Sequence, residues 1–202
     1  RTATPFIDLP AGVALSIDIA PGNSTSSAQS IYNVTTTLAA NETYIVVADG
    51  IVSPTGYSPS QPFQLSVFAG GRENAASGSN TDVLVHHGST DAPAVDVVET
   101  SVPAGTIVDN ISFPSFAGYL ELPTADYTLN ITDASGSTVV ASYLAPLSTL
   151  SLDGAAITVV ASGFLDPSQN SGGAPFGLWV ATAAGGNLIP LPAAPLSIMD
   201  FS

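Results

Sequence analysis

The sequence "TVVASGFLDP", Thr158 to Pro167, repeats "IVVADGIVSP", Ile45 to Pro54, and this repeat decides the fold class. In both copies a run of β-branched residues ends at Gly and Pro, which is typical of a strand that leads into a turn. Two further pairs keep the same offset in residue number, 113: "FIDLP" from Phe6 with "YLELP" from Tyr119, and "PFQLSV" from Pro62 with "PFGLWV" from Pro175. The chain is therefore expected to contain two copies of one strand-rich unit.

Short apolar runs between turn clusters predict an all-β chain with two tandem immunoglobulin-like antiparallel β-sandwich domains. Phe176 and Trp179 are expected to anchor the core of the second copy, with Phe63 as the counterpart of Phe176. The strands expected in the second copy are Val83 to His86, Val95 to Val98, Ile107 to Ile111, Tyr127 to Ile131, Thr138 to Tyr143, Ile157 to Ala161 and Gly177 to Ala181.

The first copy has no counterpart of residues 82–115, because subtracting the offset from 82 gives a position before Arg1. We expect an incomplete repeat over residues 1–75, a complete repeat over residues 76–190, and an extended tail over residues 191–202. A sandwich without its leading strands would expose apolar side chains and unpaired backbone groups, which soluble proteins avoid. Something is therefore expected to cover the first copy.

The charge of the chain excludes several classes of partner. A net charge of -14 arises from 16 acidic residues against Arg1 and Arg72 alone. A protein that binds nucleic acid or an anionic membrane surface needs clustered Lys and Arg side chains, so neither is an expected partner of this chain. The chain has no Cys, which excludes disulfides and thiol chemistry, and no apolar run of about twenty residues suggests membrane insertion.

Two segments resemble the signature regions of a known family, domain of unknown function 4397. The first is "HGSTDAPAVDV", which begins at His87, and it departs from the family pattern at Gly88 and Thr90. The second contains Gly118, Tyr119, Leu122, Pro123 and Tyr127. The resemblance implies β-sandwich domains on secreted or surface proteins of bacteria, often in tandem, and it implies no particular activity.

The densest group of candidate ligands or acid–base residues consists of His86, His87, Asp91, Asp96 and Glu99. A structural role, a cation site and catalysis are all considered, and a structural role is favoured because Asp91 precedes Ala-Pro in a turn, where Asp commonly bonds backbone amides. The sequence contains no Gly-x-Ser-x-Gly elbow, and two His without Cys do not form a zinc site of the usual type. We therefore expect no enzymatic activity, no cofactor and no metal.

Abundant Ser and Thr, together with five Asn-x-Ser/Thr triplets, suggest an extracellular or cell-surface protein of a bacterium. Glycans could be attached to these asparagines, although some triplets would arise by chance in such a sequence. The triplets begin at Asn23, Asn33, Asn41, Asn110 and Asn130.

The tail offers an apolar segment for subunit contact, with Leu196 and Ile198 on one face of an extended strand and Met199 and Phe201 on the other. It could pack on its own domain, or add as a strand to the incomplete first copy of a neighbouring subunit. The second arrangement predicts a structural protein that polymerises head-to-tail with itself. The alternative is a monomeric module that binds carbohydrate or a cation.

Overall fold

The computed structural model describes residues 1–53, 55–102 and 104–195. This part of the chain forms β-strands, loops and two short 3-10 turns, η1 (Ser27–Gln29) and η2 (Pro167–Gln169), so the predicted all-β class is confirmed. No helix in the described ranges is long and apolar enough to cross a membrane. The chain divides into two compact units, which we call the sandwich unit (Arg1–Phe6 with the chain from Arg72 onward) and the hairpin unit (Ile7–Gly71).

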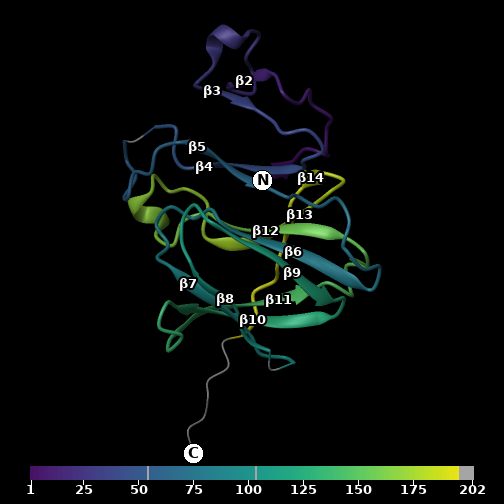
Figure 1. The fold of residues 1–202 in the computed structure, drawn as a ribbon. Helices are drawn as coiled ribbons and strands as arrows, with labels where there is room; N and C mark the ends of the chain where they lie inside the picture. Colours follow the sequence, from purple (N-terminus) through teal and green to yellow (C-terminus); the bar gives the residue numbers. More distant parts are fainter. Residues whose placement is uncertain (54, 103, 196–202) are drawn as a thin grey trace, which may run out of the picture. The chain divides into compact units, whose positions relative to one another are not determined.

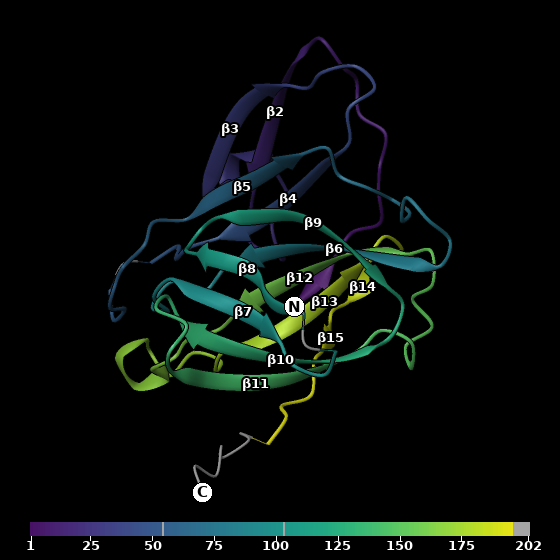
Figure 2. The ribbon, with the colours of Figure 1, turned by 60° about the horizontal axis from the view of Figure 1, so that its bottom comes forward.

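The sandwich unit contains two large sheets, which Figures 1 and 2 show as separate layers, besides the two-stranded sheet of β1 and β14. The four-stranded sheet has the order β11 (Val139–Pro146), β10 (Asp126–Asp133), β7 (Val95–Glu99) and β8 (Gly105–Ile111). The five-stranded sheet has the order β15 (Ile189–Pro190), β13 (Gly177–Thr182), β12 (Ala156–Ser162), β6 (Asn80–His87) and β9 (Phe116–Pro123). One pairing differs from the predicted antiparallel arrangement, because β12 runs parallel to β6.

Alternating apolar residues of the two sheets meet to form the core of the sandwich unit. Val97 and Ile131 come from the four-stranded sheet, and Val159 and Val180 come from the five-stranded sheet; all four are buried. Burying a side chain of this size contributes about 2 kcal/mol, so this cluster is the main source of stability in the unit.

The sequence located seven strands of the sandwich unit, β6 to β8 and β10 to β13, but missed β9 and the two-residue strands β1, β14 and β15. The sequence of β9, "FAGYLELP", contains Gly118, which interrupts the apolar alternation. Gly118 has a φ of 80°, and at this point β9 has an extra residue opposite β6, between the pairs Leu84↔Tyr119 and His86↔Phe116. Such a bulge places Gly inside a strand, where a sequence pattern suggests a turn.

Of the two expected core anchors, Phe176 packs against the core and Trp179 does not. Trp179 alternates with Leu178 and Val180, which are buried in the core, so its ring lies on the opposite face of β13. The guanidinium of Arg1 lies 4.2 Å from the centre of the Trp179 ring.

The ends of the described chain both pair with the sandwich unit. Residues 1–6, which the sequence placed in the first repeat, lie here because β1 (Thr2–Ala3) pairs with β14 (Gly186–Asn187). Near the other end, Leu144 donates from its backbone N to Pro192 O at 2.8 Å, and Ala194 donates to Ser142 O at 2.8 Å. The first part of the predicted tail therefore follows the edge of β11.

The hairpin unit contains two separate two-stranded sheets. Strand β2 (Ala14–Ile19) pairs with β3 (Tyr32–Thr37), and β4 (Tyr44–Asp49) pairs with β5 (Gln64–Ala69). Among its described residues, no apolar side chain is buried, whereas the sandwich unit holds the whole hydrophobic core.

Candidate functional site

The hairpin β4–β5 has the same register as the hairpin β12–β13 of the sandwich unit. Val46 pairs with Val67, and their counterparts in the second copy, Val159 and Val180, also pair. The same agreement holds for the pairs Ala48↔Leu65 and Ala161↔Leu178. The repeated sequence thus forms the same local structure twice.

The turn that follows the first strand of each hairpin is also the same. Gly50 and Gly163 have φ values of 78° and 101°, and a Cβ on either would lie 2.1 or 2.2 Å from the carbonyl oxygen of Pro62 or Pro175. Only glycine tolerates both this φ and this close approach of backbone. The glycine of the repeated sequence is therefore required by the turn.

The two hairpins differ in burial. Val159 and Val180 are 7% and 1% exposed, whereas Val46 and Val67 are 49% and 55% exposed. We call the surface formed by Val46, Ala48, Leu65 and Val67 the bare face; its counterparts in the second copy all belong to the hydrophobic core. No motif in the sequence marks these residues, although the constant offset between the two repeats relates each of them to a core position.

The sheet pairings explain why the face is bare. In the sandwich unit, the strands of the N-terminal half, β6 to β9, add to one edge of each sheet: β6 to β12, and β7 to β10. The strands of the C-terminal half, β10 to β13, have their counterparts in β2 to β5 by their order along the chain. The hairpin unit is thus a C-terminal half alone.

Two strand edges of the hairpin unit are consequently open. Strand β12 pairs on both sides, with β13 and β6, whereas β4 pairs in the described structure with β5 alone. Likewise β10 pairs with β11 and β7, and β2 pairs with β3 alone. An open edge beside exposed apolar side chains is a template for strand addition.

The expected subunit-contact residues of the tail, Leu196, Ile198, Met199 and Phe201, lie outside the described residues. Their part in a contact remains a prediction.

In the sandwich unit, the segment beginning at His87 fixes loops through the carboxylate of Asp91. Asp91 Oδ1 accepts hydrogen bonds from the backbone N of Leu165 at 3.0 Å and from Ser89 Oγ at 3.2 Å. Asp91 Oδ2 accepts from the backbone N of Asp166 at 2.9 Å and from Asn170 Nδ2 at 3.1 Å. Asp91 therefore bonds backbone amides, as expected, but those amides belong to the loop that follows β12, which is distant along the chain.

The second family segment also makes a clamp from side chain to backbone. The hydroxyl of Tyr127 donates to the carbonyl oxygen of Pro123 at 2.6 Å. This bond closes the turn between β9 and β10, and it satisfies a phenolic group whose ring lies in the core.

The remaining acidic residues of the candidate cluster also bond to backbone amides. Asp96 Oδ1 accepts from the backbone N of Asn110 at 2.7 Å. Glu99 accepts from the backbone N of Ser101 at 2.7 Å, of Val102 at 3.0 Å and of Ala104 at 3.3 Å, and also from Ser101 Oγ. Burial alone would raise the pKa of Glu99, but these hydrogen bonds outweigh it and lower the pKa.

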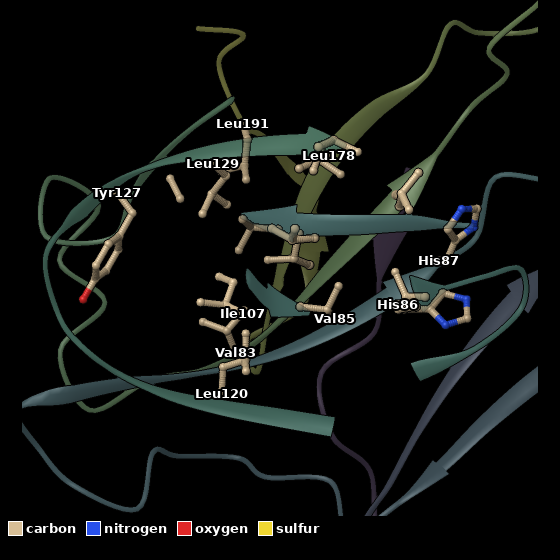
Figure 3. Close-up of a pocket in the computed structure, with 18 of the residues that line it drawn as sticks. Val83, Val85, His86, His87, Ile107, Leu120, Tyr127, Leu129, Leu178 and Leu191 are labelled. Atoms are coloured by element: carbon tan, nitrogen blue, oxygen red, sulfur yellow. The ribbon is translucent and has the colours of Figure 1, made fainter. Parts of the chain in front are cut away.

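The two histidines border an apolar cavity of about 60 Å³ between the sheets. Figure 3 shows both rings at one end of the cavity, with Tyr127 at the other end and its hydroxyl directed away. The ring of His86 lies 4.2 Å from that of Phe116, and His87 Nε2 is 3.2 Å from Pro93 O. Apart from the two histidines and Tyr127, the lining consists of apolar side chains, so the cavity offers few polar groups to a sugar or a cation.

Within the described ranges, no group of three or more His, Cys, Asp or Glu side chains could hold a metal ion. Four asparagines of the Asn-x-Ser/Thr triplets are exposed, whereas Asn130 is half-buried and accepts from Ser142 Oγ at 2.7 Å. The exposed asparagines are Asn23, Asn33, Asn41 and Asn110.

These features define a class of protein: a β-sandwich whose loops are held by clamps from side chains to backbone, in a chain that also carries half of a second such unit. The model of the family described as "Domain of unknown function (DUF4397)" matches residues 81–171, and this part of the chain belongs to that family. Asp91 and Tyr127 both lie in the matched part, and the hairpin unit lies outside it. Neither the curated proteins nor the solved structures contain a match.

Proposed function

We propose that this chain is a non-enzymatic structural subunit of a bacterial extracellular filament or surface assembly, which polymerises head-to-tail by β-strand addition between subunits. The observation that carries the proposal is the bare face of the hairpin unit. Its residues have core counterparts in the sandwich unit, yet Val46 and Val67 are about half exposed.

The gain from covering this face is comparable with the cost of bringing two subunits together. Three apolar side chains contribute about 2 kcal/mol each when they are buried. Six backbone hydrogen bonds along a strand edge contribute about 1 kcal/mol each. The gross gain is on the order of 12 kcal/mol, from which association costs of several kcal/mol are subtracted.

The symmetry of such a contact favours a polymer. A strand given by one subunit and accepted by a different surface of the next makes a heterologous contact, which closes a ring or extends as a filament. The net charge of -14 keeps the remaining surface solvated, so growth through the apolar contact does not lead to general aggregation.

Size-exclusion chromatography with light scattering, followed by negative-stain microscopy, tests the proposal. Either rods whose length grows with protein concentration or closed rings are expected. A compact monomer of 20.3 kDa at all concentrations would reject the polymer and favour the alternative, a monomeric module that binds carbohydrate or a cation.

A further inference from the structure

The repeat indicates where the hairpin unit can accept a strand. The described structure of each molecule contains two C-terminal halves of the sandwich repeat, β2 to β5 and β10 to β13. It contains one N-terminal half, β6 to β9. The edge of β4 that corresponds to the β6-paired edge of β12 pairs with no strand in the described structure, so another strand can add there.

We infer that residues 196–202 of a neighbouring molecule of this protein occupy the open edge of β4, in the place that β6 takes beside β12. This inference rests on the proposed function and names the acceptor edge and the donor segment. Seven residues in a strand span about 23 Å. This length is enough to pair with the whole of β4, which has 6 residues.

The apolar pattern of the tail matches that of the acceptor. Strand β4 has apolar residues on both faces: Val46 points to the bare face, while Ile45 and Val47 point to the other. A strand beside it should also be apolar on both faces, as buried strands with parallel neighbours are. Leu196 and Ile198 on one side, with Met199 and Phe201 on the other, provide apolar residues for both faces, while Asp200 falls on the side of Ile198 near the end of the segment.

The tail begins close to a fixed point. Ala194 donates to Ser142 O on the edge of β11, so the chain is held on its own sandwich up to this residue. The apolar segment starts directly after the next residue, Pro195.

Disulfide trapping tests this placement directly, because the chain has no Cys of its own. The full-length Val46→Cys variant is mixed with a synthetic peptide of residues 190–202 that carries Ile198→Cys or Met199→Cys. These two positions point to opposite faces of a strand, so one of them shares the face of Val46 whichever way the added strand is turned. Thr35→Cys, exposed on β3 of the same unit, is the matched acceptor control.

We expect at least ten-fold more mixed disulfide at Val46 than at Thr35, measured by intact mass. Equal trapping at the two positions would overturn the inference. So would a predominance of disulfide between two Val46→Cys chains, because it would indicate that two hairpin units cover each other.

The same experiment separates this inference from the proposed function. The full chain could form polymers although Val46→Cys does not cross-link to Ile198→Cys or Met199→Cys. This result would support the proposed filament but reject the tail as the segment that pairs with β4. Specific trapping of the peptide by a chain that never polymerises would support the acceptor edge and reject the filament.

Discussion

Val46 and Val159 hold the same position in two hairpins of identical register, yet Val46 is 49% exposed and Val159 is 7% exposed. The same substitution should therefore have different consequences at the two sites. Val159→Asp places a charge in the core and should lower the free energy of unfolding by more than about 3 kcal/mol. Val46→Asp should change it by less than about 0.5 kcal/mol, because the side chain remains in water.

Urea denaturation followed by the fluorescence of Trp179 measures both free energies. Negative-stain microscopy of the same samples should show that Val46→Asp no longer assembles, since a charged bare face resists burial. A Val46→Asp chain that is stable and still forms polymers would contradict the role given to this face.

Asp91→Ala should destabilise the sandwich unit without changing its core. Removal of the carboxylate leaves the backbone amides of Leu165 and Asp166 without their acceptor, and such a loss costs about 3 kcal/mol in total. Thermal denaturation should show a decrease of about 6–12 °C in the midpoint. Ser89→Ala removes a hydroxyl that donates to Gly163 O at 2.7 Å and lies 3.2 Å from Asp91 Oδ1, and it should cost about 1 kcal/mol. Equal effects of the two substitutions would argue against the clamp.

Glu99 should make stability depend on pH. Its pKa is lowered in the folded chain, so the ionised carboxylate stabilises the fold above its ordinary pKa near 4.5, and this contribution is lost as the pH falls through the lower folded value. At pH 7, Glu99→Gln should lower the free energy of unfolding by about 2 kcal/mol. The difference from the parent chain should shrink as the pH falls below the ordinary pKa and through the lower folded value, because the parent carboxyl becomes protonated over this range. Glu73→Gln, at an exposed position, is the control, and a pH-independent difference for Glu99→Gln would contradict the assignment.

The paired turn glycines give a test of the two units separately. Gly163→Ala places a Cβ 2.2 Å from the Pro175 carbonyl oxygen at a positive φ, so it should lower the stability of the sandwich unit by at least about 2 kcal/mol. Gly50→Ala meets the same clash at Pro62. It should leave the main unfolding transition unchanged, because the hairpin unit contributes no buried apolar side chain among its described residues. Amide hydrogen exchange should instead show faster exchange within β4 and β5.

Much of the fold could be predicted from the sequence because its signals are local. Alternating Val, Ile and Thr between turns located most strands of the sandwich, and the glycine of the repeated turn marks the same backbone conformation at Gly50 and Gly163. The bulge at Gly118 was missed because a glycine within a strand gives the same signal as a turn. Trp179 was misplaced because its size suggested the core, whereas the alternation along β13 places it on the opposite face.

The sequence by itself determined most of the strands, the repeat with its constant offset and the family of residues 81–171. Only the tertiary structure decided which of the two equal hairpins is buried, since burial depends on strands that are distant in sequence and that pair at the edges of β12 and β10. The tertiary structure also decided that Asp91 holds the distant loop at Leu165 and Asp166. A local pattern sets the conformation of a strand, but the neighbours that cover it are set by the packing of the whole unit.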